Sequence, residues 1–575
     1  MMRPTPERLP MRSGSRPPSP ARRLLRHWHM LRHVPVRQLW RRAELMASYR
    51  LAPWLPDSRA PAPPLRPRFA SSPLPLHADR ARFEDGTLTL RLPWGERRFA
   101  DPIAWSPPPA AGATAASDWA RLHYMEYLVF LGDDAFRHLV ESWIAGNPRR
   151  GRGAVRYAWR PYNLSIRVVG WMYELARRRS RLDAAFLERA AASVAAQIRF
   201  LERHLETDLR GNHLIRNIRA LLCAGAFFAG SEAERWSRLG ARLLARELEE
   251  QVLPDGMHYE RSPTYHCQVL GDLIDCRVWL PSGPLREALD ARLEAMLRVA
   301  HLLTHPDGGV ALFNDGALSG AHAVALLERS LLSLLGARPT PPRGAFALPQ
   351  AGYFGWRGED ELFVVDCGPL GPDYLIGHGH CDMLSFEWSV AGRRLIVDPG
   401  TYCYPEGRRR HLSRGTASHN TLAIAGEEQS DIYGAFRCGR RARPRLRSWR
   451  ESPHGFLFEG SHDGYRHLPG APEHVRRIAF EPGRMRLSDR LTADAGRPAA
   501  TGFLLHPDWR VDRLSETRVR MSAEDAVVEM EASVPVTLEE GEWYPELYVA
   551  RPTVRLRVAP VTAGEGVEMR FERRA

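Results

Sequence analysis

The spacing of apolar residues changes once along this chain, and that change constrains the fold more than any other feature. From about Asp118 to Gly336, apolar residues recur at i, i+3 and i+4, which is the helical period. After a Pro-rich joint at Thr340–Arg343, the chain continues in short alternating runs separated by turn residues, which is the period of strands. The switch predicts a helical domain followed by an all-β domain.

The helical part contains eight candidate helices with short connectors. Short connectors make consecutive helices pair as antiparallel hairpins, and a toroid of such hairpins would gather its loops at one end. The candidates are Asp118–Ala145, Leu164–Arg178, Leu182–Glu206, His213–Ala229, Glu232–Gln251, Tyr265–Trp279, Leu285–Thr304 and Gly320–Leu335.

The second part has the strand spacing of an antiparallel β-sandwich. The candidate strands are Glu361–Asp366, Leu384–Val390, Arg394–Val397, Thr421–Ala425, Gly455–Gly460, Arg484–Thr492, Val527–Met530 and Val554–Val558. The predicted fold class is therefore multi-domain α + β, with an α/α toroid over residues 77–338 and a β-sandwich over 345–575.

The first 76 residues form a separate, basic segment in this prediction. Residues 1–20 are rich in Pro, Arg and Ser and are expected to be disordered, and residues 53–76 are expected to be a Pro-rich linker. Between them, Arg22–Arg50 has an amphipathic helical rhythm with many Arg and His residues. No apolar run follows the basic start, so no cleavable signal peptide is expected, which favours the cytoplasm. No run in the chain is long enough for a membrane-spanning helix.

Composition excludes several chemistries. The chain has 81 Lys and Arg residues against 67 Asp and Glu, a net charge of +14, and all 81 are Arg. A chain without Lys has no Schiff-base nucleophile and no P-loop lysine. The Arg excess favours polyanions as partners, although a compositional bias of the whole proteome would produce the same excess. Seven Cys without a CxxC pair predict neither a disulfide framework nor a thiolate zinc site, and no nucleotide-binding or nucleic-acid-binding motif is present.

The densest polar cluster lies in the β part. His378 and His380 stand two residues apart in a Gly-rich segment, Asp398 ends an apolar run, and His419 follows in Arg414-Gly-Thr-Ala-Ser-His. Two His and one carboxylate on neighbouring strands suit Zn²⁺, with a fourth position open. The alternative is that these are ordinary hydrogen-bonded loop histidines.

The second cluster starts two helices. Asn212 and His213 begin one helix, and Asn212 is also a plausible N-cap. Tyr265 falls in the first turn of another, where it could equally be a core or rim aromatic. A core or rim aromatic would not need the polar segment just before it, which contains Tyr259, Glu260 and Arg261. A third patch, Trp159 to Arg167, combines aromatic rings for sugar stacking with an Arg for a carboxylate.

Taken in order, these segments resemble the heparinase II/III-like polysaccharide lyases. The resemblance covers about residues 120 to 510, and it rests on Gly211-Asn-His-Leu-Ile-Arg-Asn, Asp255-Gly-Met-His-Tyr-Glu-Arg-Ser-Pro-Thr-Tyr-His, Gly377-His-Gly-His-Cys-Asp-Met-Leu-Ser-Phe, Val397-Asp-Pro-Gly-Thr-Tyr and Arg414-Gly-Thr-Ala-Ser-His-Asn-Thr. It implies an incomplete α/α toroid followed by an antiparallel β-sandwich. It also implies cleavage of acidic polysaccharides by β-elimination and, against the missing signal peptide, a periplasmic or cell-envelope location.

The resemblance also implies roles for individual residues. Asn212 would bind the uronate carboxylate, Tyr265 would act as base, acid or both, and His378 would be a second base or a neutraliser of charge. One divalent metal, Zn²⁺ in a structural role, would be held by His380, Asp398 and His419. Further contacts to substrate are expected from His213, Arg167, Tyr259, Glu260, Arg261 and Arg414. Other lyases of this group have His at the place of Asn212, or a Glu near it, whereas this helix offers Arg216 and Asn217.

The sequence thus supports three hypotheses for function. The first is a lyase acting on a uronate-containing polysaccharide, with its active site in a cleft between the two domains. The second is a non-catalytic polysaccharide-binding protein of exopolysaccharide production. The third is a hydrolase that uses a metal at His380, Asp398 and His419 to activate water.

Overall fold

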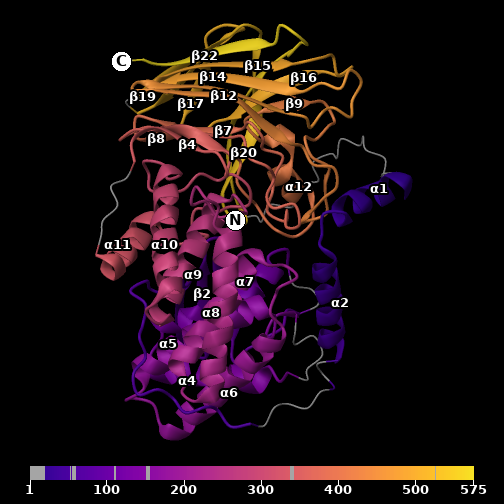
Figure 1. Ribbon diagram of the computed structural model, residues 1–575. Coiled ribbons are helices and arrows are strands. Elements are labelled where there is room, and N and C mark those ends of the chain that lie inside the picture. Colours follow the sequence, from indigo (N-terminus) through magenta and orange to yellow (C-terminus); the bar gives the residue numbers. More distant parts are fainter. Residues whose placement is uncertain are drawn as a thin grey trace.

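The computed structural model describes residues 20–51, 54, 60–108, 112–149, 156–336, 342–524 and 526–574. Helices make up one half of the molecule and β-sheets the other (Figure 1). The disorder predicted for residues 1–20 lies, up to residue 19, outside the described residues.

The helical half follows the predicted period closely. Its helices are α3 (Ala115–Tyr124), α4 (Asp133–Gly146), α5 (Pro161–Arg178), α6 (Ala184–Arg203), α7 (Gly211–Phe227), α8 (Ser231–Gln251), α9 (Pro263–Trp279), α10 (Pro284–Leu302) and α11 (Val324–Leu335). Before them lie α1 (Pro20–Leu31) and α2 (Val36–Leu51), and a short helix α12 (Arg408–Arg414) belongs to the β half.

Two long helices of the prediction are interrupted in the structure. The expected helix Asp118–Ala145 divides into α3, the 3₁₀-helix η2 (Glu126–Phe130) and α4, because Met125 adopts the left-handed conformation with φ 53° and ends the first helix. Pro35 precedes α2 and separates it from α1, since the residue before a proline disfavours the helical conformation.

A small sheet at the start of the helical half was missed. Strands β1 (Arg80–Glu84), β2 (Thr87–Leu92) and β3 (Gly95–Ala100) form an antiparallel meander, in a region expected to be part of the toroid. On β2, Leu88, Leu90 and Leu92 are buried in the core of the helices. The prediction for residues 77–338 therefore needs this correction.

The β half contains four antiparallel sheets. The first three are an eight-stranded sheet in the order β12-β13-β14-β15-β22-β19-β18-β17, a five-stranded sheet β4-β5-β6-β7-β8 and a four-stranded sheet β20-β21-β16-β9, and a β10-β11 hairpin is the fourth. The strands are β4 (Gly344–Leu348), β5 (Tyr353–Arg357), β6 (Leu362–Asp366), β7 (Phe386–Val390), β8 (Arg393–Ile396), β9 (Leu422–Ile424), β10 (Ile432–Tyr433), β11 (Arg437–Cys438), β12 (Pro444–Ser452), β13 (Gly455–His462), β14 (His474–Glu481), β15 (Arg484–Leu491), β16 (Ala499–Leu504), β17 (Arg510–Arg513), β18 (Arg518–Ala523), β19 (Ala526–Ala532), β20 (Val536–Glu546), β21 (Val549–Val558) and β22 (Val567–Arg574).

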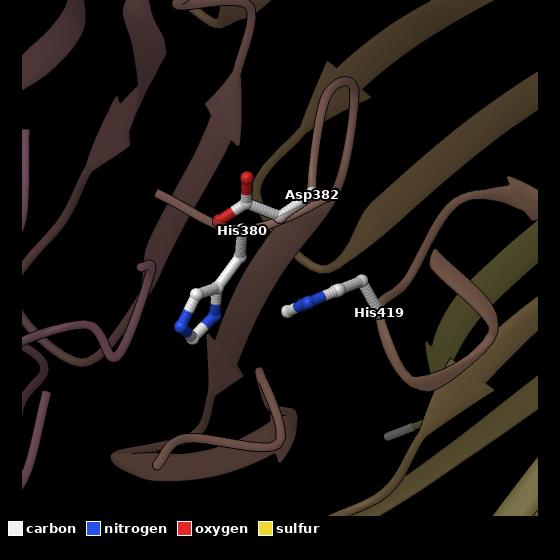
Figure 2. Close-up of side chains that lie close together, drawn as sticks. All are labelled: His380, Asp382 and His419. Atoms are coloured by element: carbon white, nitrogen blue, oxygen red, sulfur yellow. The ribbon is translucent and has the colours of Figure 1, made fainter. Parts of the chain in front are cut away.

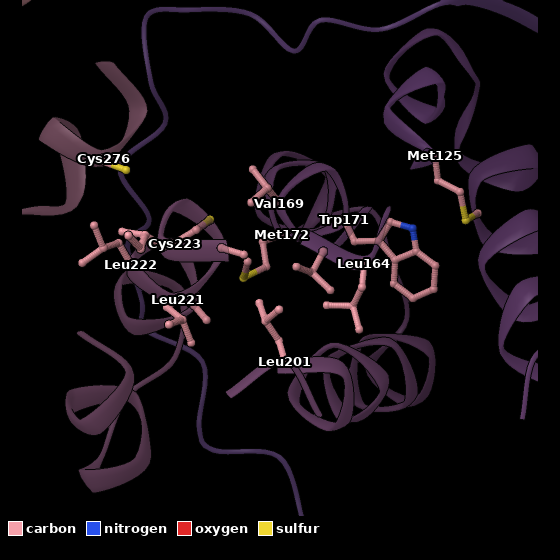
Figure 3. Packing of buried hydrophobic residues seen from close by; sticks show 14 of the residues in the cluster. Met125, Leu164, Val169, Trp171, Met172, Leu201, Leu221, Leu222, Cys223 and Cys276 are labelled. Atoms are coloured by element: carbon pink, nitrogen blue, oxygen red, sulfur yellow. The ribbon is translucent and has the colours of Figure 1, made fainter. Parts of the chain in front are cut away.

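Each half has its own apolar core. In the helical half, side chains of α5 such as Leu164 and Trp171 pack against Leu201 of α6 and Leu221 of α7 (Figure 3). In the β half, Phe363 of the five-stranded sheet meets Phe480 of the eight-stranded sheet, with ring centroids 4.9 Å apart. This face-to-face packing of two sheets is that of a β-sandwich.

A third core joins the two halves. Leu302 and Phe313, on either side of the turn after α10, pack with Tyr353 and Val364 of the five-stranded sheet. Beyond Phe313 the chain runs against the β half, where the backbone N–H of Asn314 donates to Asp382 at 3.1 Å. The halves are thus packed together, and polar residues from both meet at this junction.

Candidate functional site

The first turn of α7 is built for a close approach of its backbone to a carboxylate. Gly211 has φ +56°, and a Cβ there would lie 2.0 Å from Oε1 of Glu260, so only glycine fits. Its N–H donates to the Tyr259 hydroxyl at 2.9 Å, and the N–H of Asn212 donates to Glu260 Oε1 at 2.9 Å. The N-cap is Arg210, so the N-cap alternative for Asn212 is wrong.

Tyr265 lies at the start of α9 and faces the β half. Ser262 caps this helix by accepting the N–H of Tyr265 at 3.2 Å. The Tyr265 ring packs on the ring of His378 with centroids 4.1 Å apart, and its hydroxyl is hydrogen-bonded to that of Tyr404 at 2.9 Å. Burial, with Tyr404 and Asp315 nearby, raises the pKa of Tyr265 well above its ordinary value. The phenol is therefore protonated at neutral pH.

Five residues form a ring around this point, joined by four contacts and, between Tyr265 and Gln268, by one turn of α9. The backbone N–H of Asn212 donates to Glu260 Oε1, and Nε2 of His378 lies 3.5 Å from Glu260 Oε2, an oxygen that is buried and has no hydrogen bond. The ring of His378 packs against that of Tyr265 at a tilt of 33°, and Gln268 lies one turn further along α9. The amide of Asn212 donates to Gln268 Oε1 at 3.0 Å and closes the ring. The three residues predicted to be catalytic are thus brought together, with α7 and α9 on one side and the β half on the other.

Asp315 anchors this ring through a hydrogen bond to His378. It is fully buried, and it accepts hydrogen bonds from His378 Nδ1 at 2.8 Å and His380 Nε2 at 3.0 Å. Both terminal nitrogens of Arg410 and the Thr401 hydroxyl also donate to it. Burial alone would raise the pKa of Asp315, but Arg410 and the two histidines outweigh burial and hold it well below its ordinary value. His378 is oriented by a buried, ionised carboxylate.

Asp315 and Glu260 also determine the pKa of His378. Burial would lower the pKa of His378, but the hydrogen bond to Asp315 and the charge of Glu260 outweigh burial and raise it above its ordinary value. Because Nδ1 donates to Asp315, the nitrogen that faces the ring and Tyr265 is Nε2.

Two of the three predicted metal ligands, His380 and His419, belong to a second buried cluster beside Asp315. Ligand atoms of His380, Asp382 and His419 lie within 4.8 Å of one another (Figure 2). Nδ1 of His380 and Nε2 of His419 are buried without a hydrogen-bond partner, and each is a free imidazole nitrogen. Two such nitrogens with one carboxylate fit a divalent ion of the zinc type.

Asp398 contacts this cluster through His419. Its Oδ2 accepts the Nδ1 proton of His419 at 2.8 Å, which fixes the ring with Nε2 toward His380. Burial raises the pKa of Asp398 to about 6. In this structure the carboxylate that converges with the two histidines is Asp382, which the sequence analysis had not selected, and Asp398 orients His419 in the way carboxylates orient metal-binding histidines.

Two of the six residues expected to contact substrate lie at the ring. Glu260 is part of it, and His213, next to Asn212, is partly exposed. His213 Nδ1 is bonded to Glu206 at 3.0 Å, and its ring lies 4.4 Å from that of Tyr162.

The other four are corrected by the structure, because their polar groups are committed to the interior. Arg167 is fully buried, lies 4.0 Å over the ring of Trp143 and donates to Gln197 and to backbone carbonyls. Arg261 and Arg414 donate to backbone carbonyls of neighbouring loops, and Tyr259 supports the start of α7. These four residues build the scaffold of the site.

Besides Asp382, sequence reasoning missed four residues of the site: Asp315, Arg410, Tyr404 and Gln268. Gln268 had a usable signal, because a residue three positions after Tyr265 on a helix lies on the same face. For Asp315 the only signal was a polar Asn-Asp-Gly after an apolar run.

Two family models together match most of the chain. The model of the heparinase II/III N-terminus matches residues 133–335, and that of the heparinase II/III-like C-terminal region matches residues 340–572. FtsZ-localized protein C of Caulobacter vibrioides is 26% identical over 422 residues, which cover 68% of this chain and 69% of that protein. A heparin-sulfate lyase of Bacteroides thetaiotaomicron is 23% identical over 340 residues, and this chain spans about half of its length, 48%.

Solved structures show the same fold. A crystal structure of heparinase III matches with a TM-score of 0.68 and 19% identity, over 82% of this chain and 79% of that one. The heparan sulfate lyase HepC from Pedobacter heparinus matches with a TM-score of 0.57 and 19% identity, over 84% and 80%. The predicted fold, an incomplete α/α toroid followed by an antiparallel β-sandwich, is confirmed.

Proposed function

Since this chain belongs to the heparinase II/III-like family, we propose that it is a polysaccharide lyase that cleaves a uronate-containing polymer by β-elimination. The observation that carries the proposal is the ring of Asn212, Glu260, His378, Tyr265 and Gln268 at the junction of the two halves. It places an imidazole and a phenol in contact, with an amide donor linked to them through Glu260 and Gln268. β-Elimination needs a group that neutralises the carboxylate, a base and an acid, and these three side chains can fill those roles.

The reaction removes the C5 proton of a uronate and breaks the C4–O4 bond. The Asn212 amide binds the substrate carboxylate and stabilises the negative charge that spreads into it as the C5 proton leaves. Nε2 of His378 takes that proton, with Nδ1 held by Asp315. The electron pair left at C5 forms the C4=C5 double bond, and O4 departs with the C4–O4 pair.

Tyr265 completes the proton balance. Its phenol is protonated, and it gives its proton to the departing O4. The proton gained by His378 must then return to Tyr265, and the two rings are in direct contact. Tyr404, hydrogen-bonded to the Tyr265 hydroxyl at 2.9 Å, holds that oxygen in position.

A divalent ion held by His380, Asp382 and His419, with Asp398 behind His419, supports this arrangement without taking part in it. It would link the segment that carries His380 and Asp382 to the segment that carries His419. The Asp315 carboxylate accepts hydrogen bonds from both His380 and His378, so it connects the metal cluster to the base. We propose Zn²⁺ from the nitrogen-rich donor set.

Two substitutions at Asn212 test the proposal. Asn212→Asp would put a negative charge against the uronate carboxylate, and we expect it to lower kcat/KM by at least about a hundredfold. Asn212→Gln keeps an amide and should cost distinctly less. The expected order is wild type, then Gln, then Asp, and equal activity of the two variants would argue against carboxylate binding by Asn212.

A second candidate function is binding of an acidic polysaccharide without cleavage, as in exopolysaccharide production. It is kept because one relative, FtsZ-localized protein C, is named for a location and not for a lyase activity. This reading predicts that polymer is bound and no unsaturated product is formed. A metal-dependent hydrolase would instead give products without a double bond and lose activity with a chelator.

A further inference from the structure

Exposed apolar side chains are concentrated in one short segment. The described residues include 16 large hydrophobic side chains that are exposed, and ten of them lie between residues 24 and 54. They are Leu24, Leu25, Trp28, Leu31, Val36, Leu39, Trp40, Met46, Leu51 and Trp54. Single exposed apolar residues are normal on a protein surface, but a cluster of this size marks an interaction site.

On each helix these residues lie on one face. On α1, Leu24, Leu25, Trp28 and Leu31 follow the spacing i, i+1, i+4 and i+7. On α2 the face consists of Val36, Leu39, Trp40, Ala43, Met46 and Ala47, at i, i+3, i+4, i+7, i+10 and i+11. Both sets describe a continuous stripe along a helix.

The opposite faces hold both helices to the body of the protein. Arg26 of α1 forms an ion pair with Asp431 at 2.6 Å, beside the β10-β11 hairpin. On α2, Ser48 is hydrogen-bonded to His204, at the end of α6, at 2.7 Å. Figure 1 shows the two helices along one flank of the molecule. The apolar stripes are therefore the outward faces of two anchored helices.

The charge of the segment indicates what these faces meet. Residues 20–51 contain eight Arg and a single acidic residue, Glu44. Arg37, Arg42 and Arg50 are exposed on α2, beside its apolar stripe. Trp28 and Trp40 are 64% and 76% exposed. Apolar stripes with Trp and flanking Arg suit the boundary between lipid headgroups and acyl chains, where anionic phosphates attract the Arg side chains.

We propose that α1 and α2 form a membrane-binding face that lays the protein on an anionic lipid surface. No helix among the described residues is long and apolar enough to cross a bilayer, so the helices lie in the interface. A protein partner is less well matched by the observations, because eight Arg against the single acidic residue Glu44 make the charge of this segment strongly positive, and an anionic headgroup layer complements that charge along its whole extent. The proposal is independent of the lyase chemistry.

Sedimentation with lipid vesicles tests it on the full-length chain. We expect the protein to pellet with vesicles of equal parts phosphatidylcholine and phosphatidylglycerol, more than with phosphatidylcholine alone, and less at high salt. The double substitution Trp28→Glu and Trp40→Glu should lower binding on the order of tenfold or more. The matched control, Leu457→Glu and Leu514→Glu, changes two exposed leucines of the β half and should leave binding unchanged.

Two results would overturn the proposal. One is a wild-type protein that stays in solution with the anionic vesicles, and the other is a Trp double variant that binds them as well as wild type. Light scattering on the same samples identifies a competing occupant: a wild-type dimer that becomes monomeric in the Trp variant, without vesicle binding, would assign the face to a second copy of the chain. Circular dichroism establishes that both double variants remain folded.

Discussion

Replacing Asp315 by Asn tests how strongly one buried carboxylate organises the junction of the two halves. Both of its oxygens accept hydrogen bonds, and its charge is balanced by Arg410, which is 1% exposed. Asn cannot carry that charge, and its NH₂ group would face a donor of Arg410 or His378. Removing one partner of a buried ion pair costs about 3–5 kcal/mol, because the other charge is left uncompensated. We expect a loss in the upper part of this range, since two histidine contacts are lost with it.

Urea unfolding followed by circular dichroism measures this loss. The matched control is Asp134→Asn, because Asp134 is 94% exposed and pairs only with Arg137 on the same helix, so its loss should cost at most about 1 kcal/mol. Turnover by folded Asp315→Asn should also fall, since His378 loses the partner that orients it. A stability loss for Asp315→Asn no larger than that of the control would refute the reasoning.

Three further predictions concern residues around the site. Burial raises the pKa of Glu126 to about 7, so the native state binds its proton more tightly than the unfolded state, and stability falls as pH rises from about 4.5 to 7. Glu126→Gln should therefore raise the free energy of unfolding by up to about 3 kcal/mol near pH 8 and change it little near pH 4. Urea titrations at both pH values measure the difference. Added Zn²⁺ should raise the Tm of wild type but not of His419→Ala, and an equal rise in both would count against the metal cluster. Arg167→Met should lower stability while KM of the folded fraction stays unchanged, since that side chain is scaffold, whereas a raised KM would restore its predicted role in substrate binding.

The period of the apolar residues was sufficient to predict the two halves of the fold. The helices α3 to α11 have 10 to 21 residues, about three to six turns each, and each turn repeats the same apolar pattern. The β1–β3 meander was missed because its strands have only five or six residues, and β1 has no buried residue and β3 a single one. The break at Met125 was missed because a left-handed residue other than Gly or Asn leaves no sequence signal.

The candidate site was predictable in part, because only some of its residues stand out in their local sequence. Asn212, Tyr265 and His378 lie at starts of helices or in Gly-rich loops, where polar residues stand out. Asp315 does not stand out, because its partners His378 and Arg410 lie 63 and 95 residues further along the chain. Arg167 was assigned to substrate from its sequence context, but α5 is buried on nearly all sides and its arginine pairs inside the core.

The central claim is that this chain breaks a uronate polymer by elimination, and ultraviolet absorbance tests it most directly. Elimination leaves a C4=C5 double bond conjugated to the carboxylate, which absorbs in the ultraviolet, whereas hydrolysis and binding leave none. Wild type and Tyr265→Phe should be incubated with a panel of acidic polysaccharides, including heparan sulfate and alginate. We predict that absorbance rises with wild type on at least one polymer, and that Tyr265→Phe, folded and still binding that polymer, is slower by at least about a hundredfold. A rise of equal rate with Tyr265→Phe, or new chain ends without any absorbance, would contradict the account.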